Sequence, residues 1–373
     1  MESFEVESEE TTEKKEEDKN MAVGILVAII ALLCTSSVVP LVDRYEGVPS
    51  ILRIIWRFEL TVLYGFPLSV YYWHKNRKNL DHAKIWTLRT ATELFVSSLC
   101  FVVADVFFIW SSDYTLVSHS YLLANLGGVF IVLMNLIRFL PVHYLEIFGT
   151  IIVVFAGVLC VNDNSSTKTN NQTNIFWGDM VAVACSPLYG LYVVYSDNLL
   201  TKLPAMVIIV ASFSIQLMLV IPVYVCFSGY ENTVSFDPHY GLLGWASEEY
   251  LIYSLTFVAL LAGVPGIGGY VFPLSYFPPH IVASIFLLDP IVGEVIGVFL
   301  GQDNMPGILT YIGTLGVLVG LGLTMRGNLL IKKQQSQKKA QSLPVESLLE
   351  EFDTPSSKSP KLSRSMPESL RNI

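Results

Sequence analysis

Residues 21–42 read MAVGILVAIIALLCTSSVVPLV, a run of 22 residues without one charged side chain. An α-helix rises about 1.5 Å per residue, so about 20 apolar residues cross the roughly 30 Å of hydrocarbon in a bilayer. The segment therefore predicts a membrane-spanning helix, and it is too long for the apolar region of a signal peptide.

Nine further apolar segments of similar length follow. They lie at about 50–73, 88–110, 115–137, 145–161, 177–195, 203–227, 250–274, 280–300 and 307–325. Lipid offers backbone groups no hydrogen-bond partner, so such segments cross it as helices that satisfy their own N–H and C=O groups. The predicted fold is an all-α membrane protein with ten transmembrane helices.

The distribution of charge supports this fold class. Charged residues make up 15% of the 373 positions, against about 25% in an ordinary soluble domain. Of the 55 charged residues, 12 lie in residues 1–20 and 13 in residues 327–373, so residues 21–326 hold only 30. A soluble enzyme, a nucleic-acid-binding protein and a disordered scaffold are thereby excluded, and the two charged ends are predicted to be disordered tails.

The orientation of the chain follows from the Lys and Arg residues in its short loops, because such residues are more frequent on the cytosolic side of membranes. A cytosolic N-terminus places six of these cations inside and leaves Arg44 and Lys168 outside. The six are Lys75, Arg77, Lys78, Lys84, Arg138 and Lys202. Both termini are then cytosolic, while the choice between plasma membrane and endomembrane stays open.

The polar loop at residues 162–176 lies outside in this topology. It contains two N-glycosylation acceptor tripeptides, which begin at Asn164 and Asn171. The loop also divides the ten segments into two sets of five, residues 21–161 and 177–326. Because five is odd, the second set runs upside down relative to the first, which is the inverted-repeat plan of many secondary transporters.

Four short motifs resemble a known family. They are Trp56-Arg57-Phe58, the stretch from Thr115 to Leu126 (TLVSHSYLLANL), Gly178-Asp179-Met180 and Leu288-Asp289-Pro290. With the ten-segment layout, they make residues 21–326 similar to the drug/metabolite transporter superfamily, in its EamA-like branch. The Gly-Glu pair usual after segments four and nine is absent, since Arg138-Phe139-Leu140 and Gly301-Gln302 stand there. The resemblance implies a carrier that moves a small metabolite by alternating access.

Ionisable residues inside hydrocarbon are costly, so each one is a functional candidate. Arg57, Asp105 and Glu294 lie at similar depths from the external side, which would let Arg57 pair with either acid. Such a pair could simply fix the packing of helices, or it could serve as an outer gate or a clamp for a substrate carboxylate.

Asn125 and Asp289 each lie nine or ten residues into their segments, near the middle of the membrane, and are reached from opposite sides. Carriers built from inverted repeats bind substrate at this depth. Pro290 after Asp289 disturbs the helix and frees carbonyl groups there. We expect Asp289 to be functional, whereas for Asn125 a hydrogen bond to a neighbouring helix is favoured over a contact with substrate.

Two further glutamates and several glycines complete the candidates. Glu59 lies near mid-depth and could carry a coupling proton, because a carboxyl group removed from water favours its neutral form. Glu93 lies near the cytosolic end and is expected to be solvated. Gly293, Gly297 and Gly301 follow Asp289 at intervals of four and predict close helix packing. In segment ten, Gly316 and Gly320 have the same spacing and suit either packing or a homodimer contact.

The absence of basic residues from most of the second half narrows the substrate class. No Lys or Arg occurs from Leu203 to Met325, and carriers of phosphorylated substrates need fixed positive charge. We therefore expect a small neutral or amine-bearing substrate, with proton coupling as an option. The alternatives are a nucleotide-sugar or phosphorylated-metabolite antiporter, and a non-transporting assembly or regulatory protein. No nucleophile with its base suggests an enzyme, and no residue pattern suggests a cofactor, a metal or a nucleic-acid partner beside the lipid bilayer.

Overall fold

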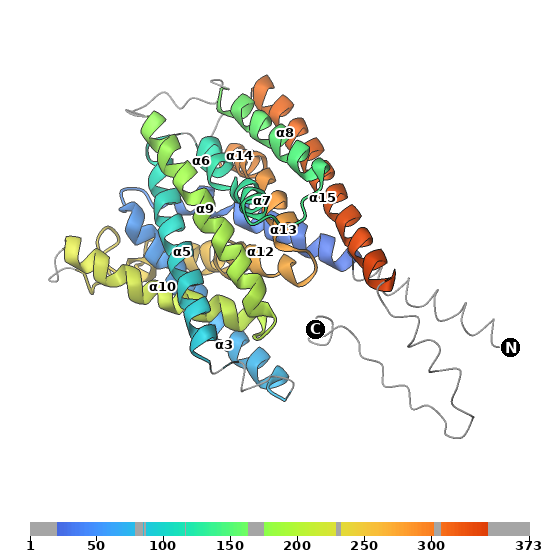
Figure 1. Ribbon diagram of the computed structural model, residues 1–373. Helices are drawn as coiled ribbons and strands as arrows, with labels where there is room; N and C mark the ends of the chain where they lie inside the picture. The colour runs from blue at the N-terminus through green and yellow to red at the C-terminus, as the bar shows by residue number, and fades with distance from the viewer. Residues whose placement is uncertain are drawn as a thin grey trace, which may run out of the picture.

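The computed structural model describes residues 21–78, 85, 87–115, 117–162, 175–228, 233–301 and 307–341. Within these ranges the chain forms helices and no strands (Figure 1). Residues 21–36 form the first helix. The other long helices are α3 (Ser50–Asn76), α5 (Leu88–Ser112), α7 (Gly127–Ile137), α8 (Tyr144–Val161), α9 (Ile175–Leu200), α10 (Ala205–Ser228), α14 (Asp289–Phe299) and α15 (Ile308–Gln341).

Shorter helices connect or extend these. They are α2 (Val38–Val42), α6 (Val117–Ala124), η2 (Gly244–Ala246), α11 (Leu251–Tyr253), the π-helix η3 (Ser254–Gly263), α12 (Val264–Val271), η4 (Pro273–Ser275), α13 (Pro279–Ile285) and η5 (Phe286–Leu288). Each segment predicted to span a membrane is therefore mainly helical in the part that the structure describes.

The described chain has six helical segments long and apolar enough to cross a membrane. They are Met21–Val42, Leu88–Ser112, Ser120–Ile137, Phe176–Leu200, Ala205–Phe227 and Leu251–Ser275. Two shorter apolar helices cover Tyr144–Leu159 and Tyr311–Thr324. The protein thus has the character of an all-α membrane protein, while the count of ten crossings stays a prediction.

Two of the predicted segments are interrupted near their midpoints. Helix α6 ends at Ala124 and α7 begins at Gly127, and α13 ends at Ile285 before α14 begins at Asp289. Pro290 occupies the first turn of α14, where its missing N–H costs nothing because that position has no intrahelical acceptor. These interruptions place Asn125 and Asp289 at helix ends rather than inside continuous helices.

Segment eight is also irregular. A π-helical stretch, η3, runs to Gly263, and α12 continues from Val264. Beyond this point, a side chain at Gly266 would meet the carbonyl oxygen of Cys34, and one at Gly269 would meet Thr35. The glycines therefore allow segment eight to pack closely on the first helix.

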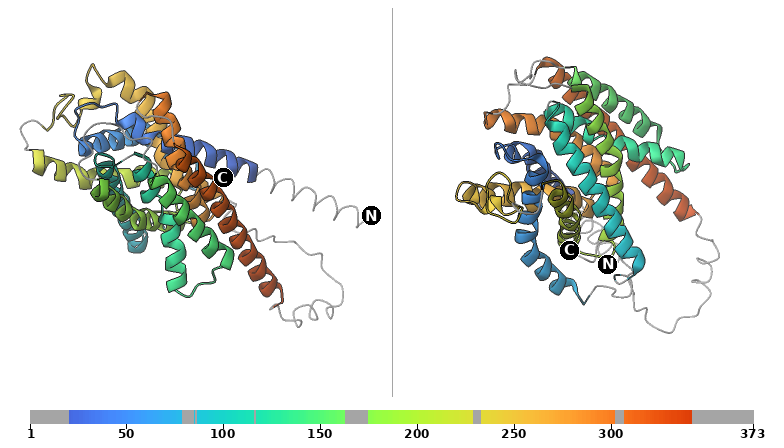
Figure 2. Two further views of the ribbon diagram at one scale, coloured as in Figure 1. Left: turned by 90° about the horizontal axis from the view of Figure 1, so that it is seen from above. Right: turned by 90° about the vertical axis from the view of Figure 1, so that its left-hand side faces the viewer.

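Helix α15 lies along α8 (Figure 1 and Figure 2). A Cβ atom added at Gly149 would lie 2.5 Å from the carbonyl oxygen of Gly320, and one added at Gly316 would lie 2.8 Å from Cβ of Ala156. The two glycines of segment ten therefore serve packing inside the chain. By contrast, Gly301 has φ +72° and no atom within 4 Å of an added Cβ, so it ends a helix in the left-handed region instead of extending the packing stripe.

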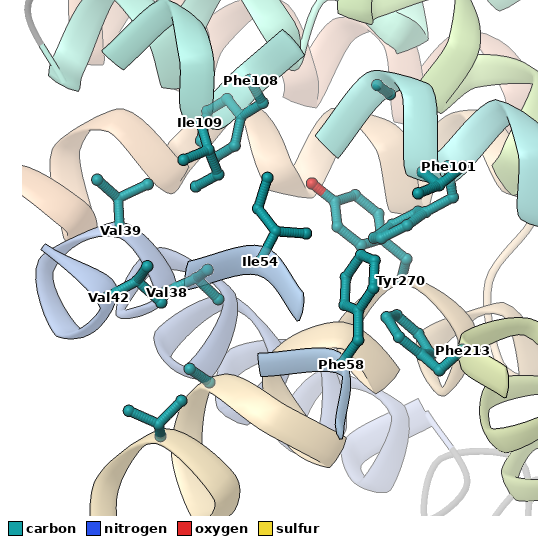
Figure 3. Close-up of a cluster of buried hydrophobic side chains, with 14 of the residues drawn as sticks. Val38, Val39, Val42, Ile54, Phe58, Phe101, Phe108, Ile109, Phe213 and Tyr270 are labelled. Atoms are coloured by element: carbon teal, nitrogen blue, oxygen red, sulfur yellow. The ribbon is translucent and has the colours of Figure 1, made fainter. Parts of the chain in front are cut away.

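The core is formed where helices of the two halves meet. Helix α3 packs on α10, α5 on α9, and α6 on α14. The side chains of Phe58 in α3 and Phe213 in α10 are fully buried and contact each other. Trp56 is fully buried against Tyr45 and Tyr250. Phe58, Phe213, Phe101 and Tyr270 lie next to one another in Figure 3. This aromatic core surrounds the polar residues described next.

Candidate functional site

Asp289 is the centre of a buried polar network. Its carboxyl group is fully buried and accepts two hydrogen bonds. One comes from the Ser36 hydroxyl at 2.7 Å and the other from Nδ2 of Asn125 at 3.0 Å. Residues from the first helix, the α6–α7 interruption and the start of α14 thus meet at one carboxyl group. The two residues that the sequence places at mid-depth are directly bonded.

The network continues through two tyrosines. Oδ1 of Asn125 accepts a hydrogen bond from the Tyr270 hydroxyl at 3.1 Å. The Tyr121 hydroxyl accepts from the backbone N–H of Val39 at 3.1 Å and donates to the carbonyl oxygen of Ser36 at 3.0 Å. The bonds to Tyr270 and Asp289 fix the orientation of the Asn125 amide, because its oxygen accepts from one and its nitrogen donates to the other.

Arg57 and Asp105 form a buried ion pair, with side chains 3% and 4% exposed. The Tyr189 hydroxyl donates to the other oxygen of Asp105 at 3.4 Å. The Arg57 guanidinium also lies 5.3 Å from the centre of the Phe58 ring, a favourable cation–π distance. Of the two acids expected near Arg57, Asp105 is therefore its partner. The side chain of Glu294 lies outside the described part of the structure.

A cavity of about 30 Å³ joins the ion pair to the polar network. This volume holds one or two water molecules. Its polar lining comes from Thr35, Arg57, Asp105 and Asn125, and its aromatic lining from Phe101, Phe108, Tyr121, Tyr189 and Tyr270. Since these residues come from both halves of the chain, the cavity lies between the halves.

The two other glutamates behave differently from the cavity residues. Glu59 is half-buried and accepts a hydrogen bond from the Trp245 indole N–H at 2.7 Å, away from the cavity lining. Glu93 was expected to be solvated, but it is only 9% exposed and bonds both Arg89 and Lys202. The prediction that Glu93 is solvated was wrong, because Lys202 from the α9–α10 connection forms an ion pair with it.

Little in the sequence distinguishes the tyrosines or Ser36 from ordinary packing residues. Tyrosine in an apolar helix is usually core, and 18 tyrosines occur in the chain. Tyr121 alone falls within a motif stretch. Ser36 follows a long apolar run as part of a Thr-Ser-Ser triplet, a polar interruption that marks it only in hindsight.

Other expectations concern residues beyond this site. The acceptors Asn164 and Asn171 lie outside the described residues. In the described ranges, no three His, Cys, Asp or Glu side chains are grouped so that they could hold a metal ion.

Comparisons with known proteins bear on the fold alone. A scan against protein-family models and a search of curated proteins each found no match. A search of solved structures found a chain, described only as a protein, with a TM-score of 0.58 and 15% sequence identity. The match covers 83% of this chain and 99% of that chain. The likeness at this identity shows a shared architecture.

Proposed function

We propose that the protein is a secondary active transporter of the drug/metabolite type, which moves a small neutral or amine-bearing metabolite by alternating access. The observation that carries the proposal is the hydrogen bond between Asn125 and Asp289 beside a buried cavity. Interrupted helices in corresponding positions of two halves are typical of carrier binding sites, because the interruption frees polar backbone near mid-membrane.

Helix pairing supports two inverted five-helix repeats, residues 21–161 and 177–326. Predicted segment two packs on seven, four on nine, and five on ten, as α3 on α10, α6 on α14 and α8 on α15. A two-fold axis in the membrane plane would exchange the partners of each pair. The contact of segment three with six and that of segment eight with one are likewise exchanged by such an axis.

In the proposed topology, one contact between the halves lies on each side of the membrane. With both termini cytosolic, the ion pair of Glu93 in α5 with Lys202 in the α9–α10 connection lies on the cytosolic side and joins the halves. On the external side, Tyr45 from the first half packs its ring 5.1 Å from Tyr250 and 5.7 Å from Tyr253 of the second. Alternating access would open these two contacts in turn.

We assign coupling to Asp289 rather than to Glu59. Within the described residues Asp289 has hydrogen-bond donors but no cationic partner, and an uncompensated buried carboxylate is strongly unfavourable. A proton or a cationic substrate would neutralise it. Glu59, bonded to Trp245 and away from the cavity, lacks direct access to a bound substrate.

The competing functions are less well supported. A nucleotide-sugar or phosphate antiporter needs available positive charge, yet Arg57 is the one cation lining the described cavity and Asp105 already neutralises it. A non-transporting assembly protein would act through its tails, and it gives no reason to retain charged residues around a buried cavity.

Uptake into proteoliposomes from a panel of labelled metabolites, at two pH values, tests the proposal. We expect saturable uptake of at least one small neutral or amine-bearing compound by the wild type. Asp289→Asn should lose the response to a pH gradient, whereas Asp237→Asn, at an exposed residue away from the cavity lining, should retain it. Uptake equal to that of empty liposomes for the whole panel would refute the carrier function.

A further inference from the structure

We infer that the central cavity recognises the ammonium group of a small organic cation through the faces of its aromatic rings. This assignment narrows the substrate class and rests on the proposed function for the access of that substrate to the site. It is carried by the arrangement of five rings around the cavity and by the uncompensated carboxyl group one hydrogen bond behind its wall.

The rings around the cavity lie at several angles to one another rather than in a single stack. Tyr189 and Tyr270 are nearly parallel, with centres 5.9 Å apart and an angle of 7° between the ring planes. Phe101 stands across both, at 71° to Tyr189 and 74° to Tyr270. Phe108 lies at 75° to Tyr189. All four rings, with that of Tyr121, line the same small cavity, and aromatic rings gathered around one volume are the chemistry that attracts ammonium groups.

The charges around the cavity favour a cation. Arg57 and Asp105 neutralise each other, so together they contribute no net charge. Asp289 adds a negative group without a cationic partner in the described part of the chain, and Asn125 connects it to the cavity. A positively charged ligand therefore gains both from the ring faces and from this carboxylate, whereas an anion would meet electron-rich rings.

The bonding of Tyr270 strengthens the same preference. Its hydroxyl donates to Oδ1 of Asn125, whose Nδ2 donates to Asp289. Hydrogen bonds in such a chain polarise one another, so an ionised Asp289 makes the Tyr270 hydroxyl and its ring more electron-rich. The Tyr270 ring lies beside that of Phe101 (Figure 3). A neutral apolar ligand would draw no benefit from this arrangement.

Equilibrium binding to the purified full-length protein in lipid nanodiscs tests the inference. The probes are labelled choline, methylammonium and tetramethylammonium, with 3,3-dimethylbutan-1-ol as the neutral isostere of choline and phosphocholine as an anionic counterpart. We expect saturable binding of at least one ammonium probe. Choline should bind at least tenfold more tightly than its neutral isostere, as a desolvated cation–π contribution implies.

Matched variants separate the rings from the fold. Tyr189→Leu removes a ring and should weaken ammonium binding about tenfold, whereas Tyr189→Phe keeps the ring and should stay within about threefold of the wild type. Asp289→Asn should reduce the preference for choline over its isostere but leave the part that the rings supply. A thermal unfolding midpoint for each variant identifies any that fail to fold. If Tyr189→Leu fails to fold, the Tyr189→Phe variant still compares ammonium binding with that of the wild type.

The outcomes distinguish this inference from the carrier function. Equal affinity for choline and 3,3-dimethylbutan-1-ol, or no binding of any ammonium probe, would overturn the inference. In that case, uptake of a neutral metabolite in proteoliposomes would leave the carrier function intact. Selective ammonium binding without flux would support the inference and argue against transport.

Discussion

Arg57 and Asp105 show how a buried charge is tolerated at the residue scale. Each charged group would lose its hydration in an apolar interior at a cost of several kcal/mol, so each depends on the other. Tyr189 adds a hydrogen bond to Asp105, and Phe58 adds a cation–π contact to Arg57. Such a pair gives little net stability over an apolar replacement, but it makes the loss of one partner expensive.

Replacement of one partner should therefore destabilise the protein more than replacement of both. We expect Arg57→Met or Asp105→Leu alone to lower the free energy of unfolding by about 3–5 kcal/mol, because a single buried charge is left uncompensated. The double variant Arg57→Met/Asp105→Leu should recover much of this loss. Thermal unfolding of detergent-solubilised protein measures all three, and additive losses would argue against a coupled pair.

Much of the site could be predicted from residue type alone. Arg57, Asp105, Asn125 and Asp289 are polar residues in apolar segments, and the structure brings all four to one cavity and its wall. Their cost in hydrocarbon makes them conspicuous. The five rings and Ser36 could not be selected, because aromatic residues and serines also occur throughout ordinary helix contacts. Asp105 could not be chosen over Glu294 as the partner of Arg57, because the sequence does not show how each helix is rotated about its axis.

At the scale of elements, the positions of helices were more predictable than their interruptions. The apolar segments mark the helices, and Pro290 marks the start of α14. The gap between α6 and α7 at Asn125 contains no proline, so tertiary contacts must stabilise it. Close packing supplies some of them, since a side chain at Gly127 would lie 3.2 Å from the backbone of Gly190 in α9.

The contact between α8 and α15 offers a test of close helix packing. A methyl group at Gly149 would lie 2.5 Å from the carbonyl oxygen of Gly320 and 3.0 Å from the Thr324 backbone nitrogen. Gly149→Ala should thus cost about 1–3 kcal/mol, in the range for overpacked sites.

Gly322→Ala is the matched control in α15. Nothing lies within 4 Å of a Cβ atom added there, and alanine has the higher helix propensity by up to about 1 kcal/mol. The control should be neutral or stabilising by thermal unfolding. Equal destabilisation by Gly149→Ala and Gly322→Ala would mean that α8 and α15 do not pack through these glycines.

At the scale of the whole molecule, the topology is the first claim to test. With ten crossings and cytosolic termini, Asn164 and Asn171 lie in an external loop. Expression in a glycosylating cell should give a mobility shift that a glycosidase removes. The double variant Asn164→Gln/Asn171→Gln should lack the shift. An unglycosylated loop that resists protease from the external side would contradict this orientation.

The architecture of the halves also predicts where motion occurs. Glu93 and Lys202 join the halves near one end of α5, whereas Arg53 binds Asp43 and Asp113 within the first half alone. In the proposed carrier, opening toward the cytosol would break the Glu93–Lys202 pair and leave the Arg53 cluster intact.

A reversible crosslink across this pair tests alternating access most directly. The variant Glu93→Cys/Lys202→Cys, with the five native cysteines replaced by alanine, is reconstituted and treated with a short bifunctional thiol reagent that dithiothreitol cleaves. Flux of a substrate identified by the uptake panel should fall to the level of empty liposomes on crosslinking and return on cleavage. Undiminished flux through the crosslinked protein would contradict movement of the two halves about the central cavity.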